Sequence, residues 1–220
     1  MPEIKPKQDV NGHTLLHHEV IAENPDAPWL VFVHGAGGSI RTWKFQIDAF
    51  APHFRLLLID LRDHGYSKDI LPEFPAYDFD IVAKDILVLT DHLGIEKIPV
   101  VGHSMGAFVS VVFAHRHPSR VESLLLVDGG LPLDVPPGLD ADAVVAHVLG
   151  PTAARLSMRF GSIDDYLEFW RPHPAFAQAW SPEIESYFAY DLVDDGSGML
   201  RPATSYETMV DDKDEFLKDH

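Results

Sequence analysis

The sequence predicts an α/β fold, in which a doubly wound, mostly parallel sheet is followed by a helical cap. The first observation is a set of four continuous apolar runs without alternation, typical of strands covered on both faces. The second is that segments of helical length and period separate these runs, as in right-handed strand–helix–strand crossovers. The third is that no further buried strand is recognisable after Leu131. The four runs are 29–33, 55–60, 98–101 and 123–127.

The remaining elements of the sheet region can be placed in order. Residues 13–21 carry enough β-branched and apolar side chains for a strand, which we expect at an antiparallel edge. Ser39 can cap a first helix, and Asp80 can cap a second one that stops at Gly94. Residues 105–114 are apolar nearly all round, which predicts a third helix in the interior of the protein.

The last part of the chain has a different pattern. Prolines interrupt it at 132, 136 and 137, and amphipathic segments follow at roughly 140–149, 151–160 and 162–170. Aromatic residues are frequent here, which suits a helical layer lying over a sheet. We therefore divide the chain into a sheet region, 1–130, and a helical cap region, 131–220.

Composition limits the classes of function. With 220 residues and 46% hydrophobic side chains, the chain has the composition of a soluble globular protein with one main core. Its net charge of −17 argues against a nucleic-acid partner, because phosphates would be repelled. The absence of cysteine excludes a thiol nucleophile and thiolate metal sites. No apolar run approaches the roughly 18 residues of a membrane span, and the first residues lack a signal-peptide core, so we expect a cytoplasmic protein without a membrane partner.

The most informative motif is Gly102-His103-Ser104-Met105-Gly106, which directly follows a predicted strand and opens a predicted helix. A sharp strand-to-helix turn with this Gly-x-Ser-x-Gly pattern is a candidate nucleophile elbow. Both glycines are needed because a turn this tight brings backbone segments close together and leaves no room for a Cβ atom. The motif therefore predicts that Ser104 is held above the end of the sheet as a nucleophile.

Three further segments join this motif in a pattern that resembles the α/β-hydrolase superfamily, in the branch that carries a helical cap. The four matches follow apolar strands in the order found in that family and cover residues 28–130. They are His34-Gly35-Ala36-Gly37-Gly38-Ser39, Asp60-Leu61-Arg62-Asp63-His64-Gly65-Tyr66-Ser67, 102–106, and Leu124-Leu125-Leu126-Val127-Asp128-Gly129-Gly130. Residues 169–171 and 187–192 resemble the family's caps more loosely.

The resemblance implies roles for individual residues in acyl transfer. Ser104 would be the nucleophile, and the backbone N–H of Met105 would be one donor of the oxyanion hole. The second donor would come from the loop after His34-Gly35, from Ala36 or from Gly37. The rival interpretation of this glycine-rich loop, a phosphate cradle, lacks the Gly-Lys-Ser/Thr ending and the dinucleotide spacing.

Three histidines near these motifs are assigned structural roles. His34 is interpreted as a loop anchor, and His103 as a packing residue, because the elbow directs neighbouring side chains apart. The 60–67 segment is interpreted as a turn from strand to helix, so His64 is not taken as the general base. No metal-binding pattern occurs, and neither a metal nor a cofactor is expected.

The resemblance also implies a catalytic acid and a histidine later in the chain, after further core strands. Those strands are not recognisable before the sequence reaches His220, and no residue matches the family's histidine. Asp128 is the only candidate for the acid, a weak one. We therefore expect an incomplete hydrolase core in a truncated product of a longer protein, nearly inactive alone. The strand at 123–127 would then be an open sheet edge through which the chain could self-associate.

Taken together, these features predict a serine hydrolase acting on a small, mainly apolar carbonyl substrate, with a carboxylic ester as the first choice. The alternatives are a C–C bond hydrolase of the same family and a non-catalytic ligand-binding protein of the same fold. A protein that only assembles through the open strand is a third class. A serine nucleophile disfavours epoxide hydrolase and haloalkane dehalogenase chemistry, which in this family uses aspartate.

Overall fold

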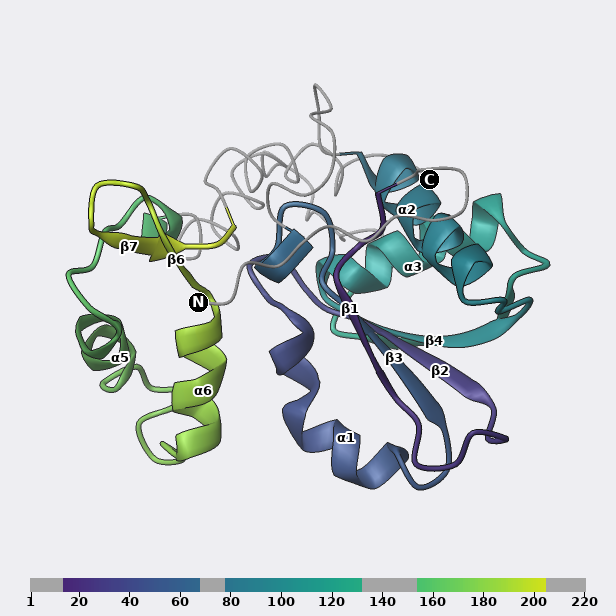
Figure 1. Cartoon of the computed structure of the whole chain (residues 1–220), viewed down its shortest axis with the longest axis horizontal. Coiled ribbons are helices and arrows are strands. Elements are labelled where there is room, and N and C mark those ends of the chain that lie inside the picture. The colour runs from purple at the N-terminus through teal and green to yellow at the C-terminus, as the bar shows by residue number, and fades with distance from the viewer. Residues whose placement is uncertain (1–13, 68–77, 132–153, 205–220) are drawn as a thin grey trace, which may run out of the picture.

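The computed structural model describes residues 14–67, 78–131 and 154–204. In Figure 1, one part of the molecule is a sheet flanked by helices, and the other part is a smaller group of helices and short strands. The sheet region contains β1 (His18–Ile21), β2 (Trp29–Val33), η1 (Ile40–Trp43), α1 (Lys44–Phe50), β3 (Arg55–Ile59), η2 (Gly65–Ser67), α2 (Phe79–His92), β4 (Ile98–His103), α3 (Met105–Arg116) and β5 (Val121–Val127). The smaller group contains α5 (Ile163–Trp170), α6 (Pro182–Tyr190), β6 (Leu192–Asp194) and β7 (Leu200–Pro202).

The five strands of the main sheet are arranged in the order β1-β3-β2-β4-β5. β1 pairs antiparallel with β3, whereas β2, β3, β4 and β5 are parallel to one another. This arrangement confirms the predicted doubly wound sheet with an antiparallel edge strand. Because all four parallel strands end on the same side, the segments that follow β2, β3, β4 and β5 meet at one edge of the sheet.

The two faces of the sheet are covered by different elements. One core cluster joins alternate residues of β2 and β3, such as Val31 and Leu57, to α2 and α3. The other joins the opposite residues, such as Phe32 and Leu58, to η1 and also to Tyr190 of α6. The central strands are therefore buried on both faces, as their continuous apolar sequences predict.

Helix boundaries agree with the sequence prediction at two positions and differ at one. Ser39 caps η1 with a reciprocal capping box, and Gly94 follows α2 with a φ of +66°, as a C-terminal glycine does. The predicted cap Asp80 is wrong, because Asp78 caps α2 and accepts a hydrogen bond from the Asp80 N–H. Asp78 is the residue that adopts the extended backbone required of an N-cap, whereas Asp80 lies inside the first turn.

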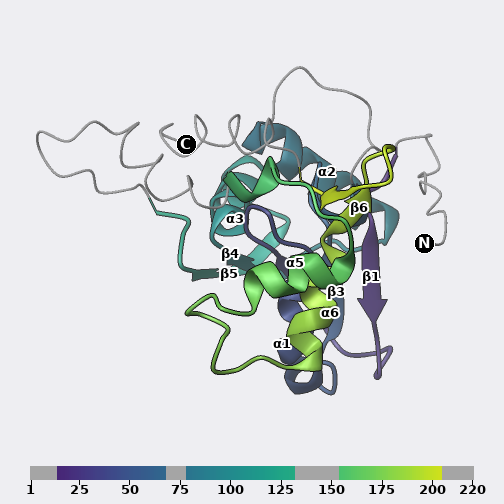
Figure 2. The ribbon, with the colours of Figure 1, turned by 90° about the vertical axis from the view of Figure 1, so that its left-hand side faces the viewer.

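The smaller group has its own core and also contains strands that sequence reasoning missed. β6 and β7 form a two-stranded antiparallel sheet, each strand only three residues long, so their pattern is too short to recognise. Helix α5 lies within the predicted segment 162–170, and part of the predicted segment 151–160 is helical at 154–156. The predicted segment 140–149 lies outside the described residues. In Figure 2, α5 and α6 lie in front of the sheet region.

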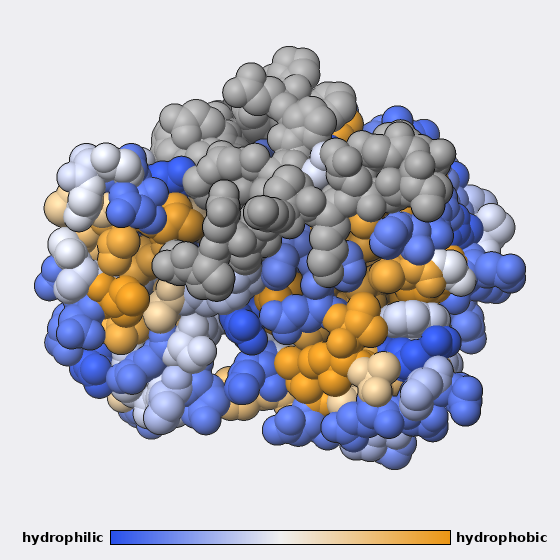
Figure 3. Space-filling model, viewed as in Figure 1, coloured by the Kyte–Doolittle hydropathy of each residue, from blue (hydrophilic) through white to orange (hydrophobic). Residues whose placement is uncertain are grey.

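Hydrophobic residues on the visible face form two separate groups, one over α5 and the β6–β7 hairpin and the other over the sheet near β1 (Figure 3). At the other edge of the sheet, β5 exposes Leu125 by 58% and Val127 by 40%. Among the described residues, no helix is long and apolar enough to cross a membrane.

Candidate active site

Ser104 lies at the junction of β4 and α3 with a φ of +51° and a ψ of −123°. This left-handed φ is unfavourable for a residue with a side chain, and such strain costs about 1–3 kcal/mol unless neighbouring contacts enforce it. Two backbone hydrogen bonds do so here. The Ser104 N–H donates to the carbonyl of Val127 at 2.9 Å, and the Ser104 carbonyl accepts from the Ala107 N–H at 2.9 Å. The sequence thus produces the sharp turn that the pentapeptide predicts.

The two glycines of the pentapeptide are required by close backbone contacts. A Cβ on Gly102 would come within 2.6 Å of both the Gly106 carbonyl oxygen and the Ser110 Oγ. A Cβ on Gly106 would overlap the carbonyl oxygens of Val33 and His34 at the end of β2. Helix α3 can therefore pack directly against β2 only because position 106 has no side chain.

The loop after β2 lies against Ser104. A Cβ on Gly35 would approach the Ser104 Cβ to 2.9 Å, so only glycine allows this contact. The loop then turns tightly, because the Gly38 N–H donates to the Gly35 carbonyl at 3.0 Å. The Gly37 N–H donates to His64 Nε2 at 3.0 Å and is therefore already used within the protein. The sequence left Ala36 and Gly37 as alternatives for the second oxyanion donor, and this hydrogen bond already occupies the Gly37 N–H.

The buried side chains of His34 and His64 hold this loop in place through hydrogen bonds to the backbone. His34 Nδ1 donates to the Gly35 carbonyl, and its Nε2 accepts from the Leu61 N–H. His64 Nδ1 donates to the Arg62 carbonyl, and its Nε2 accepts from Gly37. Burial is the main factor that lowers the pKa of His34 to about 3 and that of His64 to about 4. Both rings are neutral and fully engaged with the backbone, so neither can accept the proton of Ser104.

The other predicted site residues lie in different surroundings. Met105 is completely buried at the first position of α3, where helix N–H groups have no partner within the helix. His103 is half-buried and lies edge-on to Trp43, with 6.4 Å between ring centroids. Asp128 follows β5 with a φ of +52° and is exposed, while its neighbour Gly129 packs on the Ser104 backbone. His220 lies outside the described residues.

A pocket of about 150 Å³ lies between the loop after β2 and the helices α5 and α6. Its lining combines the backbone of that loop with aromatic and charged residues from the smaller group of elements. The lining residues are Ala36, Gly37, Arg155, Trp170, Phe176, Tyr187, Phe188 and Asp191.

Two lining residues belong to a buried polar cluster, Arg155–Tyr166–Asp191. Arg155 Nη1 donates to both the Tyr166 hydroxyl and Asp191 Oδ2, and the Tyr166 hydroxyl donates to Asp191 Oδ2 at 2.6 Å. Burial raises the pKa of Asp191, and the neighbouring Arg155 opposes that effect. Sequence reasoning missed this cluster. An arginine in a region rich in aromatics was the only available signal.

Comparison with known proteins identifies the fold family. Residues 28–154 match the sequence profile described as the alpha/beta hydrolase fold. The chain belongs to the α/β-hydrolase family. In the solved structures, E-2-(acetamidomethylene)succinate hydrolase superimposes with a TM-score of 0.72 and 23% identity, covering 98% of this chain and 74% of that one. A marine microorganism esterase gives a TM-score of 0.71 at 18% identity, covering 94% and 74% of the two chains.

Curated relatives of this α/β hydrolase have diverse names. The acetyltransferase component of the acetoin cleaving system of Pseudomonas putida is 39% identical over 55% of this chain and 31% of its own length. A putative esterase/lipase of Haemophilus influenzae is 30% identical over 54% of this chain and 41% of its own length. The chain thus spans less than half the length of these relatives. A 2-succinyl-6-hydroxy-2,4-cyclohexadiene-1-carboxylate synthase of Enterobacter is 28% identical over 90% of this chain and 73% of its own length.

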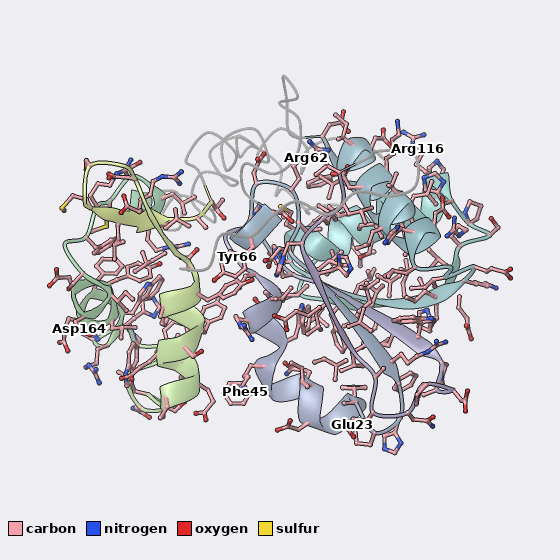
Figure 4. All side chains as sticks on the ribbon, in the orientation of Figure 1. Glu23, Phe45, Arg62, Tyr66, Arg116 and Asp164 are labelled. Atoms are coloured by element: carbon pink, nitrogen blue, oxygen red, sulfur yellow. The ribbon has the colours of Figure 1, made fainter. Side chains whose placement is uncertain are left out.

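A second buried carboxylate joins the hydrolase sheet to α6, and sequence reasoning missed this role too. Asp60, at the end of β3, accepts hydrogen bonds from the Ile40 and Tyr66 N–H groups at 2.8 and 2.9 Å. The hydroxyl of Tyr190 in α6 donates to the same carboxylate at 2.8 Å. Tyr66 also lies between the two regions, with its ring centroid 4.5 Å from that of Tyr190 (Figure 4). Within the described residues, no cluster of side chains could hold a metal ion.

Proposed function

We propose that the chain carries the nucleophile of a serine hydrolase that acts on small, mainly apolar carbonyl compounds, with carboxylic esters as the first choice. The observation that carries this proposal is the strained backbone of Ser104, held at a φ of +51° against Gly35. Such strain persists only where the surrounding structure enforces it, as is expected of an elbow that holds a serine hydroxyl above the strand ends. Family membership supports the same chemistry.

In the proposed reaction, Ser104 Oγ attacks the ester carbonyl carbon, and the carbonyl oxygen becomes an oxyanion. The N–H groups of Met105 and Ala36 stabilise that charge, each contributing about 3 kcal/mol to lowering the barrier. The engagement of Gly37 with His64 supports Ala36 as the second donor. The intermediate collapses, the alcohol leaves with the proton taken from Ser104, and water then hydrolyses the acyl-enzyme.

A base must carry that proton, and the locked rings of His34 and His64 cannot do so. Asp128 is our candidate for the acid that would orient such a base. Loss of the base in a triad enzyme lowers the rate about a million-fold. Because neither of these two described histidines can serve as that base, we propose that Ser104 reacts slowly.

The experiment is labelling with a fluorophosphonate, followed by intact mass spectrometry over hours. We expect slow attachment of one label to the wild-type chain, none to Ser104→Ala, and unchanged labelling of Ser186→Ala, a matched control because Ser186 is exposed on α6. Added imidazole should accelerate the Ser104-dependent labelling by supplying a base. Equal labelling of the wild type and Ser104→Ala would overturn the assignment of Ser104 as the nucleophile, and fast labelling without imidazole would overturn the proposed slow reaction.

The second candidate is a ligand-binding protein of the same fold, favoured by the full engagement of the two buried histidines near the elbow. It predicts that Ser104 never reacts although a ligand occupies the pocket. A C–C bond hydrolase would use the same nucleophile and oxyanion hole as an esterase, so labelling does not separate these two activities. They are separated by measuring turnover of a diketone-like acid and of an ester of similar size.

A further inference from the structure

Helix α6 joins the smaller group of elements to the sheet region, and it also forms part of the pocket wall. It lies next to η1 (Figure 1). Tyr187 and Phe188 of α6, and Asp191 directly after it, line the pocket opposite the loop after β2. In the smaller group, Tyr190 is the described residue that belongs to the sheet core. The position of α6 therefore sets how wide this pocket is.

The hydrogen bond that fixes Tyr190 ends on a carboxylate surrounded by donors. Asp60 is completely buried, and its Oδ1 accepts from the Ile40 N–H at 2.8 Å. Its Oδ2 accepts from both the Tyr66 N–H and the Tyr190 hydroxyl, at 2.9 and 2.8 Å. A Cβ on Gly65 would overlap the same carboxylate, so Asp60 cannot turn toward that side. All three partners thus suit the ionised carboxylate, which only accepts hydrogen bonds.

Protonation of Asp60 conflicts with this set of partners. A carboxylic acid carries a proton that needs an acceptor, and a backbone N–H cannot be one. Of the three partners, only the Tyr190 hydroxyl can reverse and accept that proton. The charge-assisted bond from Tyr190 is then replaced by a weaker one between neutral groups. Because burial raises the pKa of Asp60 to about 6, this reversal falls in mildly acidic solution.

Other charged and titratable groups face this hydrogen bond from the neighbouring elements. Glu19 of β1 adds to the upward shift of the carboxylate's pKa. Arg41 of η1 pairs with Glu19 at 3.5 Å, and its guanidinium carbon lies 4.8 Å from the Tyr190 ring centroid. The ring of Tyr66 contacts the ring of His17, with 5.2 Å between their centroids. Because histidines also titrate in mildly acidic solution, a test has to separate the carboxylate from His17.

We propose that Tyr190 is a positioning residue of the pocket: its hydrogen bond to ionised Asp60 holds α6 against the sheet, and protonation of Asp60 releases α6 and widens the pocket. The pocket is thus narrow in neutral solution and wider in mildly acidic solution. This inference holds whether or not Ser104 is a nucleophile. For the proposed hydrolase, it makes access to the pocket dependent on pH.

The test measures a distance between the two regions, in a chain that contains no cysteine and can therefore be labelled at chosen positions. Spin labels on Ser186→Cys of α6 and His115→Cys of α3, both exposed, report the position of α6 by pulsed electron spin resonance. We expect one distance at pH 8 and a second, longer one at pH 5, with a midpoint near pH 6. The control pair, exposed Asp48→Cys of α1 with His115→Cys, lies within the sheet region and should keep one distance at both pH values.

Two further variants identify the groups responsible. Asp60→Asn keeps an acceptor oxygen but cannot ionise, and Tyr190→Phe removes the hydroxyl. Each labelled variant should show the longer distance at pH 8 as well as at pH 5, and Tyr190→Phe alone decides the outcome if Asp60→Asn does not fold. An unchanged distance in the wild type between pH 5 and pH 8 overturns the proposal. A pH-dependent change that persists in either variant also overturns it, because another group, such as His17 or Asp191, would then move α6. So does a single short distance in Tyr190→Phe at pH 8.

Discussion

Different forces hold the elbow at Ser104 and the Arg155–Tyr166–Asp191 cluster. The elbow depends on backbone contacts so close that Gly102 and Gly106 leave no space for one more carbon atom. The cluster depends on charge and hydrogen bonding between side chains that come from three separate segments. The elbow should therefore be most sensitive to an added atom, and the cluster to a removed charge.

Gly106→Ala should have the largest effect, because its Cβ would overlap two backbone carbonyl oxygens that cannot move independently of β2. We expect the free energy of unfolding to fall by more than about 5 kcal/mol, or the folded protein to be lost. Gly94→Ala is the control, since a Cβ there meets nothing within 4 Å and only its φ of +66° is unfavourable. That change should cost about 1 kcal/mol. Urea unfolding measures both, and similar losses would contradict the close-contact account.

Asp191→Ala should come next, because it leaves the Arg155 charge buried without its partner. We expect a loss of about 4 kcal/mol in urea unfolding. Asp164→Ala is the control, since Asp164 is exposed in the first turn of α5 and should cost less than about 1 kcal/mol (Figure 4). The double variant Arg155→Leu/Asp191→Leu should recover most of the stability, because no charge remains unpaired. A double variant as unstable as Asp191→Ala would mean that packing, not charge, holds the cluster.

The contrast between local backbone contacts and long-range side-chain contacts also explains which parts of the structure could be predicted from the sequence. The elbow is specified within five consecutive residues, and the strand before it and helix after it are long enough to recognise, so its backbone could be predicted. Arg155 and Tyr166 are 11 positions apart and Tyr166 and Asp191 are 25 apart, and no local pattern marks such a pairing. Asp60 was recognised only as part of a turn, because its bond to Tyr190 spans 130 positions.

Tyr190 connects the two regions, and its bond to Asp60 should depend on pH. Burial is the main factor that raises the pKa of Asp60 to about 6 from its ordinary 3.8. Between these values the folded chain binds a proton that the unfolded chain has released, so this group's contribution to stability falls as pH rises from about 4 to about 6. Neighbouring Glu19 adds to the upward shift, and the hydrogen bond from Tyr190 opposes it.

Tyr190→Phe removes that hydrogen bond and should raise the pKa of Asp60 further. We expect a cost of about 2 kcal/mol at pH 8, where the acceptor is a carboxylate, and about 1 kcal/mol at pH 4, where it is neutral. Urea unfolding of both proteins across this range gives the difference at each pH. A cost that does not change with pH would mean that Asp60 is ionised throughout, contrary to its burial.

The smallest effect on stability is expected at Leu125, on the open edge strand β5, because its side chain is largely exposed. Within the described residues β5 pairs only with β4, and Leu125 is 58% exposed. We propose that two chains associate through this edge. Leu125→Lys should change the free energy of unfolding by less than about 0.5 kcal/mol, because the side chain faces solvent, and should abolish association, because an edge lysine opposes strand pairing. Light scattering at increasing protein concentration measures this association. The control is Phe45→Lys, because Phe45 lies on α1, away from the edge, and is 64% exposed. If the wild-type chain stays monomeric, or if Phe45→Lys dissociates the chains equally, β5 is not the contact.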